Sequence, residues 1–465
     1  MNRRDFLICT GALATVKVRA ATPKWRDWLE STAKPADHPL RIEPLTLEIG
    51  PGVSVKTLAY NGQVPGPLLR LRKGVPVSVD VINNSDKPDI VHWHGLFTDP
   101  FNDGACEEGS PMISAGHIFR YHLTPHPVGT RWYHTHTAAF DDLTIGTYTG
   151  QFGFLLVEGP EPQPAYDLEV NLAIHHWNPS FVPMASIMRE QSATQPLTSG
   201  SDVGYQYATI NGHMLGAGDP LRVREGQRVL LRLLNASATD NVVLALPGHS
   251  FHVIAMDGNP VPRPASVEVL SLAVGERIDA IVTMDSPGVW VLGSTLAKAR
   301  AMGLGIVVEY AGRSGVPVWK DPAPSAWDYS QFADTAETPA PDETAVLTFR
   351  DAGLLKSPRF DTWTINNKSW PDIPPIMVEQ GKRYRLIFRN SSSDQHPMHI
   401  HRHMFEVVQI GDKKMSGLMK DVVNVMPLDT VAIDLVADNP GDSLMHCHMQ
   451  LHMDYDFMQL IRYKS

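Results

Sequence analysis

Cysteine is scarce in this chain, which has 3 in 465 residues. Cys9 lies in an N-terminal segment with the features of a removable signal, which leaves Cys106 and Cys447. A fold stapled by many disulfides is excluded, because two cysteines can form only one bridge. Either these two cysteines pair with each other, or at least one of them has another role.

Long apolar runs and an excess of positive charge are also missing. No stretch reaches the roughly 18 consecutive apolar residues of a membrane-spanning helix. The formal net charge at pH 7 is −10, whereas a nucleic-acid binder usually presents a basic surface. We therefore expect no membrane span and no nucleic-acid partner. Proline (37) and glycine (35) are plentiful instead, which favours many short strands over long helices.

The first 21 residues carry the three regions of an export signal. Arg3 and Arg4 give a basic start, residues 7–16 form an apolar run, and the segment ends in small residues. The paired arginines resemble a twin-arginine signal, whose pathway exports proteins that are already folded. We predict that residues 1–21 are a signal peptide and that the twin-arginine export machinery is a partner. The protein is then periplasmic or otherwise exported.

One sequence pattern occurs three times, at residues 69–85, 221–237 and 376–392. Each copy has a glycine, then an alternating run rich in Val, Leu, Ile and Arg, and an end at Asn and Ser. The glycine and the asparagine are nine residues apart in every copy, and the copies follow one another at intervals of 152 and 155 residues. A glycine turn that leads into an alternating strand is typical of a β-sandwich hairpin.

The repeat predicts three similar β domains in series. Stretches rich in proline and acidic residues near residue 160 and over 313–343 are natural boundaries. We predict domain 1 over residues 22–160, domain 2 over 161–312, a linker over 313–343 and domain 3 over 344–465.

Ten of the 20 histidines fall in four short strings. The strings are HWHG (His92, His94), HTH (His134, His136), HPMHIH (His396, His399, His401) and HCHMQLH (His446, His448, His452). Alternate residues of a strand project to the same face, so each H-x-H pair presents two imidazoles side by side. Nine and eleven residues after the repeated asparagine, domains 1 and 3 have histidines where domain 2 has leucines. We therefore predict a metal site where domains 1 and 3 meet.

Cys447 adds a soft ligand to this set. In a strand it faces away from His446 and His448, so its thiolate can bind a second metal centre behind the histidine cluster. Together with His452 and a third histidine, for which His396 is the best candidate, it gives the Cys/His₂ set of a blue-copper site. A closed structural zinc site is a poor match for one cysteine among ten histidines. Copper is the predicted metal, and Cys106 is then predicted to form no disulfide.

The four strings, in this order over three domains, resemble the multicopper oxidase family of laccases, ascorbate oxidase, bilirubin oxidase and cuprous oxidases. The resemblance covers about residues 40–465. It implies an all-β chain of three consecutive cupredoxin-like Greek-key β-sandwich domains with four copper ions. By family roles, the type 1 copper is held by His396, Cys447 and His452, and the type 2 copper by His92 and His399. One type 3 copper takes His94, His134 and His448, and the other takes His136, His401 and His446.

The resemblance also implies a mechanism. A reductant gives up electrons singly at the type 1 site, and they pass through Cys447 and its neighbours to the three-copper cluster, where O₂ is reduced to water. Four protons are needed, so carboxylates are expected nearby. Asp103 matches a family acid that orients solvent at the cluster. Asp454 is the candidate proton donor, with a solvated loop acid as the alternative.

Ten residues after Cys447, where many bacterial relatives place a weakly binding methionine, this chain has Phe457. A group that does not coordinate copper favours Cu(I) over Cu(II) and raises the potential. We predict a high-potential type 1 site.

The predicted activity is laccase-like oxidation of phenols or aromatic amines. Oxidation of Cu(I) or another metal ion, for metal tolerance, is the alternative. Thioethers bind Cu(I), and four methionines lie close in sequence to type 1 ligands. They are Met398, Met404, Met449 and Met453. Core packing is the other interpretation of these methionines, and the methionine-rich insertion of cuprous oxidases is absent.

A copper-binding or scaffold protein without turnover is a third interpretation, against which the complete ligand set argues. Nitrite reductases share the fold but need fewer H-x-H pairs. His175, His176 and His403 fall outside the ligand pattern and are expected to be structural or surface histidines. A monomer is expected, because both metal-bearing domains belong to one chain.

Overall fold

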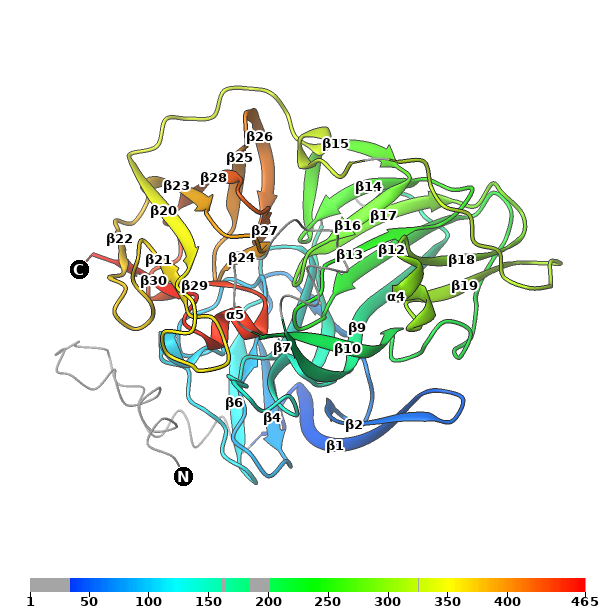
Figure 1. Ribbon diagram of the computed structural model, residues 1–465, viewed down its shortest axis with the longest axis horizontal. Coiled ribbons are helices and arrows are strands. Elements are labelled where there is room, and N and C mark those ends of the chain that lie inside the picture. Colours follow the sequence, from blue (N-terminus) through cyan, green and yellow to red (C-terminus); the bar gives the residue numbers. More distant parts are fainter. Residues whose placement is uncertain (1–33, 161–163, 184–200, 325, 465) are drawn as a thin grey trace.

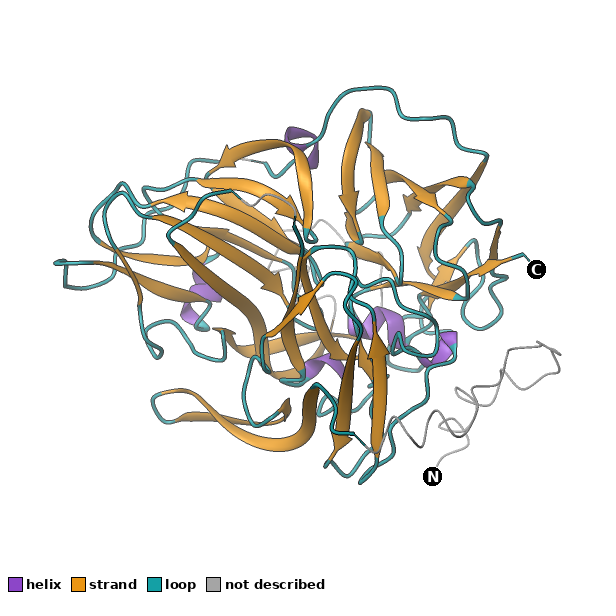
Figure 2. Ribbon diagram, turned by 180° about the vertical axis from the view of Figure 1, so that it is seen from behind, coloured by secondary structure: helices purple, strands orange, loops and turns teal. Residues whose placement is uncertain are grey.

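The structure, a computed structural model, describes residues 34–160, 164–183, 201–324 and 326–464. Strands dominate it and form three pairs of sheets (Figure 1; Figure 2). The signal predicted over residues 1–21 lies outside the described residues. No helix within the described ranges is long and apolar enough to cross a membrane.

Domain 1 consists of two four-stranded sheets, in the orders β2-β1-β4-β6 and β3-β8-β7-β5. Its elements are β1 (His38–Gly50), β2 (Val53–Tyr60), β3 (Leu69–Arg72), β4 (Val77–Asn83), β5 (Val91–His92), η1 (Cys106–Glu108), β6 (Ile118–Leu123), β7 (Gly129–Thr135), η2 (Gly146–Tyr148) and β8 (Phe152–Glu158). The long β1–β2 hairpin reaches under domain 2 (Figure 1), where the Met214 N–H donates to the Ile49 carbonyl at 2.8 Å.

Domain 2 has a six-stranded sheet, β10-β9-β12-β17-β14-β15, and a five-stranded sheet, β11-β19-β18-β13-β16. Its elements are β9 (Leu168–Pro183), β10 (Ser201–Ile210), β11 (Leu221–Val223), β12 (Arg228–Asn235), β13 (Val242–Ala245), β14 (Phe251–Met256), β15 (Asn259–Val267), β16 (Val269–Leu272), β17 (Arg277–Thr283), β18 (Val289–Ser294), α4 (Ala297–Ala301) and β19 (Gly305–Tyr310). Alternation of buried and exposed residues in β14 follows from one face meeting the core and the other solvent.

Domain 3 has sheets of six and five strands, in the orders β21-β20-β23-β28-β25-β26 and β22-β30-β29-β24-β27. Its elements are β20 (Glu343–Asp351), β21 (Trp363–Ile365), β22 (Ile376–Val378), β23 (Arg383–Asn390), β24 (His396–Ile400), β25 (Phe405–Ile410), β26 (Lys413–Lys420), β27 (Val422–Val425), β28 (Thr430–Val436), β29 (Ser443–Cys447), α5 (Gln450–Asp454) and β30 (Met458–Tyr463). Strands β24 and β29 are buried along their whole length, and they carry four of the predicted metal ligands, His396, His399, His446 and Cys447.

The sequence repeat is also a structural repeat. Strands β4, β12 and β23 come from the three repeated strings and take equivalent places in the first sheet of each domain. The strands that follow, β5, β13 and β24, lie in the second sheet of each domain. β5 carries His92 and β24 carries His399, whereas β13 carries Leu244. The predicted all-β chain of three consecutive β-sandwich domains is confirmed, and the boundaries between the domains stay a prediction.

The repeated asparagine fixes the loop that leads to each of these strands. Asn83, Asn235 and Asn390 are buried. Their side-chain oxygens accept hydrogen bonds from the backbone N–H of the serine two residues on, at 3.0, 3.1 and 2.9 Å. Their amide groups donate to backbone carbonyls four or five residues on. This asparagine turn is a local way of satisfying buried backbone groups, so each domain holds the following strand in the same place.

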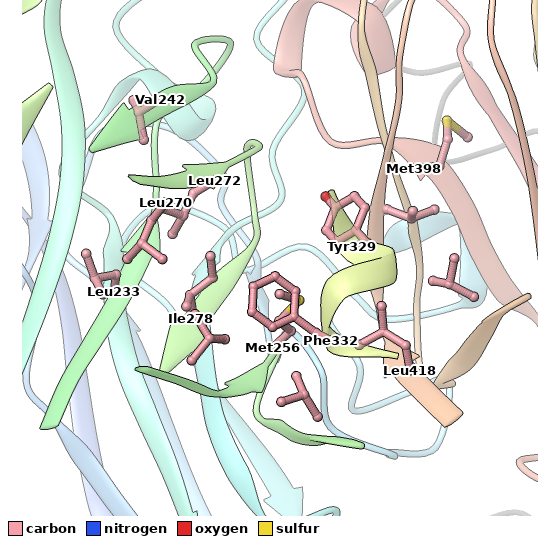
Figure 3. Close-up of a cluster of buried hydrophobic side chains, with 14 of the residues drawn as sticks. Leu233, Val242, Met256, Leu270, Leu272, Ile278, Tyr329, Phe332, Met398 and Leu418 are labelled. Atoms are coloured by element: carbon pink, nitrogen blue, oxygen red, sulfur yellow. The ribbon is translucent and has the colours of Figure 1, made fainter. Parts of the chain in front are cut away.

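Part of the interface between domains 2 and 3 is an apolar cluster. The short helix η3 (Tyr329–Phe332) lies within the segment predicted as a linker, and its Tyr329 and Phe332 are buried in the same core cluster as Met256 of domain 2 and Leu418 of domain 3 (Figure 3). Burial of apolar surface contributes about 25 cal/mol per Å² to stability, so burial of these two aromatic rings stabilises the contact between the two domains. Domain 1 has a separate core.

Candidate metal centres

The four histidine strings lie on two pairs of neighbouring strands. In domain 1, β5 pairs with β7 so that His92 is opposite His134. In domain 3, β24 pairs with β29 so that His399 is opposite His446. The first histidine of each H-x-H pair lies at or near the end of its strand and the second follows just beyond it. Both members of each pair lie at the interface between domains 1 and 3.

The eight histidines predicted for the three-copper cluster meet at this interface. His92 stacks on His401 and His94 stacks on His399, with ring centroids 3.8 Å apart in both pairs. Two further pairs join the domains, His134 with His448 and His136 with His446, and their ring centroids lie about 5 Å apart. All eight side chains are at most 8% exposed. The predicted set is His92, His94, His134, His136, His399, His401, His446 and His448, and the structure brings all of it together.

At this interface, within the described residues, several histidine ring nitrogens either have no hydrogen-bond partner or face another ring nitrogen. Five of them have no hydrogen-bond partner, on His92, His134, His136, His399 and His448. Others face another ring nitrogen, as in His401 Nε2 and His446 Nε2 at 3.1 Å and His94 Nδ1 and His448 Nε2 at 3.2 Å. Buried polar atoms without partners are costly unless a ligand satisfies them. Imidazole nitrogens suit copper, so the donor set fits that metal.

The opposite nitrogens of these rings are held by fixed acceptors. The Nδ1 atoms of His134, His399 and His446 lie 2.7–2.8 Å from backbone carbonyls. Such bonds fix which nitrogen carries the proton and leave the other one free to bind a metal.

Burial also keeps the histidines neutral, as metal binding requires. Loss of solvent lowers the pKa of His94, His134, His136, His399, His446 and His448 well below the usual value, and that of His401 to about 4.

A second donor set lies within domain 3. The Cys447 sulfur is 3.4 Å from His452 Nδ1 and 3.9 Å from His396 Nδ1, and these two nitrogens are 3.3 Å apart. Three donors that converge in this way match the trigonal Cys/His₂ arrangement of a blue-copper site. Burial raises the pKa of the Cys447 thiol, so a cation in the site is needed to stabilise the thiolate. Cys106 and Cys447 form no disulfide with each other, as predicted.

Phe457 lies beside this second set. Its ring centroid is 4.8 Å from that of His396, and the ring stacks at 12° on Trp363, which in turn lies 4.4 Å from the His452 ring. Met458 instead packs in a different cluster, with Leu444 and Met453. The group next to the Cys/His₂ set in the structure is therefore the Phe457 ring, and its effect on the potential stays a prediction.

Asp103 joins two cluster histidines from different domains. Its Oδ2 lies 2.9 Å from His401 Nδ1 and 3.1 Å from His92 Nδ1, and its Oδ1 accepts a hydrogen bond from the Thr98 hydroxyl at 2.6 Å. Although burial alone would raise it, these two histidines hold the pKa of Asp103 well below its usual range. Asp103 is thus an ionised group in direct contact with the cluster.

Glu108 is a neighbouring carboxyl that the sequence did not single out. Its Oε1 accepts from the Leu444 N–H at 2.6 Å and lies 3.3 Å from His401 Nδ1, while its Oε2 is buried without a partner. Burial and the charge of Asp103 raise the pKa of Glu108 well above its usual value. A protonated carboxyl therefore sits beside an ionised one. In the sequence, the position of Glu108 five residues after Asp103 was the available sign that it belongs to the site.

Asp454 is buried and not a solvated loop acid. Its carboxylate accepts from the backbone N–H groups of Ala139 and Phe140 at 3.1 and 2.8 Å and from the Gln450 amide at 2.8 Å. Burial raises its pKa to about 7. Through these hydrogen bonds Asp454 connects α5 to domain 1. Its role as a proton donor stays a prediction.

Asp421 was also missed from the sequence. It is fully buried between β26 and β27, 3.1 Å from His94 Nε2, and forms an ion pair with Arg277 of domain 2. It follows a lysine in an ordinary strand segment, so no local signal marks it.

The methionines near the predicted type 1 ligands pack against other protein groups. Met398 and Met453 are buried in apolar clusters. The Met404 sulfur accepts a hydrogen bond from the Asn259 amide at 3.3 Å, and Met449 packs against the core of domains 2 and 3. The three histidines outside the ligand pattern are buried and bonded to protein groups: His175 to the Ala236 carbonyl, His176 to the Ser237 hydroxyl and His403 to the Tyr463 hydroxyl.

Comparisons with known proteins agree with this geometry. Models of the family described as multicopper oxidase match residues 42–162, 186–309 and 348–464. Multicopper oxidase MmcO of Mycobacterium tuberculosis is 29% identical, over 89% of this chain and 84% of that protein. Laccase-4 of Trametes villosa is 26% identical, over 87% of this chain and 85% of that protein. The crystal structure of a multi-copper oxidase from Pseudomonas thermotolerans covers 92% of this chain and all of its own, with a TM-score of 0.69 and 26% identity.

Proposed function

Since this chain belongs to the multicopper oxidase family, and is thus a copper-containing oxidoreductase of cupredoxin-like domains that uses O₂, we propose a laccase-like activity for it. The reductants are phenols or aromatic amines, and four electrons taken from them one at a time reduce O₂ to water. The observation that carries the proposal is the string His446-Cys447-His448, which contributes to both donor sets.

Four copper ions account for the donors. His396, Cys447 and His452 would hold one, and the eight interface histidines would hold three, divided as the family resemblance implies. Bound copper supplies the one-electron redox chemistry and the reduction of O₂. The protein supplies the connection, because Cys447 is joined by peptide bonds to a histidine of the cluster on each side.

Carboxyl groups at the cluster would supply and hold protons. Glu108, neutral and in contact with His401, can give up a proton, while Asp103 stays ionised beside it and holds the His92 and His401 rings. Asp454, whose pKa is about 7, lies at the junction of α5 with domain 1 and is a further candidate donor.

Packing around the type 1 set supports an organic reductant. Trp363 packs against the His452 ring, and both side chains are buried. The nearby methionines are occupied in cores, which argues against a thioether site for Cu(I).

One observation favours a second candidate, oxidation of a metal cation. Asp394 Oδ2 lies 3.9 Å from His452 Nε2. Burial, together with Asp202, Asp351 and Asp361, raises the pKa of Asp394 to about 7. An acidic group beside a type 1 ligand, with other carboxyls near enough to raise its pKa, would attract a cation.

We further propose that the protein works as a monomer after export through the twin-arginine pathway, to the periplasm or beyond. The signal-like sequence of residues 1–21 supports this location.

Oxygen uptake by the copper-loaded protein tests the activity. It is measured in parallel with a simple phenol and with Cu(I), using wild-type protein and Asp394→Asn. Uptake on phenol that survives the substitution supports the laccase-like activity. Uptake confined to Cu(I) and lost in Asp394→Asn favours the cation oxidase, and uptake on neither makes the chain a copper-binding or scaffold protein.

A further inference from the structure

Asp421 of domain 3 lies where all three domains meet. Its Oδ1 is 3.1 Å from Nε2 of His94 in domain 1. Its two carboxylate oxygens accept hydrogen bonds from the two Nη atoms of Arg277 in domain 2, each at 2.6 Å. All three side chains are fully buried. One carboxylate therefore connects a cluster histidine to the domain that has no cluster histidines.

The backbone of Asp421 holds a second cluster histidine. Its carbonyl accepts a hydrogen bond from Nδ1 of His399 at 2.7 Å. His94 and His399 are the pair whose rings stack at 3.8 Å and 9°. With Nε2 of His94 donating to the carboxylate, its Nδ1 is the nitrogen that faces His448, and Nε2 of His399 is left without a partner at the cluster. Asp421 thus fixes both the orientation and the proton position of two rings.

Arg277 is itself rigidly held. Its Nη atoms also donate to the carbonyls of Gly275 and Asp257, at 3.0 and 3.1 Å, and its Nε donates to the Thr130 carbonyl at 3.3 Å. The Asp257 carboxylate accepts from the Arg277 N–H at 3.0 Å and pairs with Lys420 at 2.9 Å. A buried ion network adds little net stability, but when every donor is satisfied it enforces one geometry.

The glycine after His94 makes room for this contact. Gly95 has φ +83, and a Cβ there would lie 2.7 Å from Asp421 Oδ2 and 2.9 Å from Arg277 Nη2. Only glycine allows the ion pair to approach the chain directly behind the histidine.

We infer that Asp421 is a positioning residue for the copper cluster and that Arg277 of domain 2 holds it in place. Domain 2 then orients two ligands while providing none. Because both Asp421 oxygens already accept from Arg277, the residue acts through His94 and His399 and is not itself a ligand. The inference rests on the proposed function, since it takes these histidines as copper ligands.

Copper content and electron paramagnetic resonance of the full-length, copper-loaded protein test this role. In Asp421→Asn, we expect copper at the cluster to bind about 10- to 100-fold more weakly, the loss typical of an outer partner of a metal ligand. The magnetically coupled copper pair should be lost, while the blue colour of the Cys447 site, which has no contact with Asp421 in the described residues, should persist. Activity is not needed for this readout.

Asp279→Asn is the matched control. Asp279 is a buried carboxylate of domain 2 at the contact with domain 1. It accepts from Arg232 of its own domain at 2.5 Å and from the Thr130 hydroxyl of domain 1 at 2.8 Å, and in the described part of the chain it has no bond to a cluster histidine. Full copper content in Asp421→Asn, or an equal loss in Asp279→Asn, overturns the inference. If Asp421→Asn gives no blue protein, the same measurements are made on Arg277→Lys. A single ammonium cannot bind both Asp421 oxygens as the guanidinium does, so this variant should also lose copper at the cluster. Wild-type protein that binds no cluster copper would instead refute the proposed function.

Discussion

The three donors of the Cys447 site all come from domain 3, whereas the eight cluster histidines come equally from domains 1 and 3. The first set needs only one domain to fold correctly. The second exists only when two domains dock in register. Domain 2 contacts it directly through Gly275, which lies against His448, and indirectly through Arg277, which binds Asp421 of domain 3. The difference teaches that one centre is built by local chain geometry and the other by assembly of the domains.

Cys447→Ser breaks the connection between the two regions and should have the largest effect. Serine lacks the soft thiolate that a blue-copper site requires. We expect the blue colour to disappear and phenol-driven oxygen uptake to fall by more than the about 100-fold typical of losing an outer partner. Cys106→Ser is the control and should keep both properties. Rapid uptake by Cys447→Ser would contradict the electron route.

Gly275→Ala should damage the cluster and spare the Cys447 site. Gly275 has φ +85, and a Cβ would lie 2.8 Å from the His448 ring, so the ring must move. Overpacking of this kind costs about 1–3 kcal/mol, which corresponds to roughly 5- to 150-fold weaker copper binding. Copper content and visible spectra are the measurements. Gly226→Ala, with a similar φ of +79 but open space around the Cβ, controls for backbone strain; equal losses in both variants would sink the explanation.

Phe457→Met should change only the Cys447 site. A thioether would add a weak axial donor where the Phe457 ring supplies none, and an added donor favours Cu(II) relative to a site without it. The type 1 potential should therefore fall by about 59 mV for each tenfold gain in Cu(II) affinity relative to Cu(I). Redox titration of the blue band measures it. Met458→Leu, which alters a different cluster, should leave the potential unchanged. A potential that is the same in Phe457→Met and wild type would show that the ring is not the neighbour that matters.

Asp202→Asn should have the smallest effect, a change in how the free energy of unfolding depends on pH. Asp202 belongs to domain 2 and acts on Asp394, which lies beside His452 of the Cys447 site. Burial, with Asp240 nearby, raises the pKa of Asp202 to about 7, against about 3.9 in an unfolded chain. Between these values the folded state binds more protons, so the free energy of unfolding falls as the pH rises from about 4 to 7. Urea unfolding at pH 5 and pH 8 should therefore differ less in Asp202→Asn than in wild type. An unchanged difference would refute this assignment.

The sequence was most informative where chemistry depends on near neighbours. H-x-H pairs and the His-Cys-His string place ligands through the two-residue period of a strand, and the repeated glycine and asparagine predict where those strands lie. Glu108 and Asp421 could not be found in this way. Asp421 meets His94 across 327 residues of chain, and Arg277 comes from a third domain. Such contacts depend on domain docking, which local patterns do not encode.

The asparagine turn recurs with the same hydrogen bonds in all three domains, although domain 2 has leucine where the others have histidine. The turn that leads to the ligand strands is thus built from backbone, asparagine and serine groups, and it forms equally in the domain that has no predicted ligand. For the biogenesis of the protein this sets an order of events: the scaffold can be completed first and metallated afterwards.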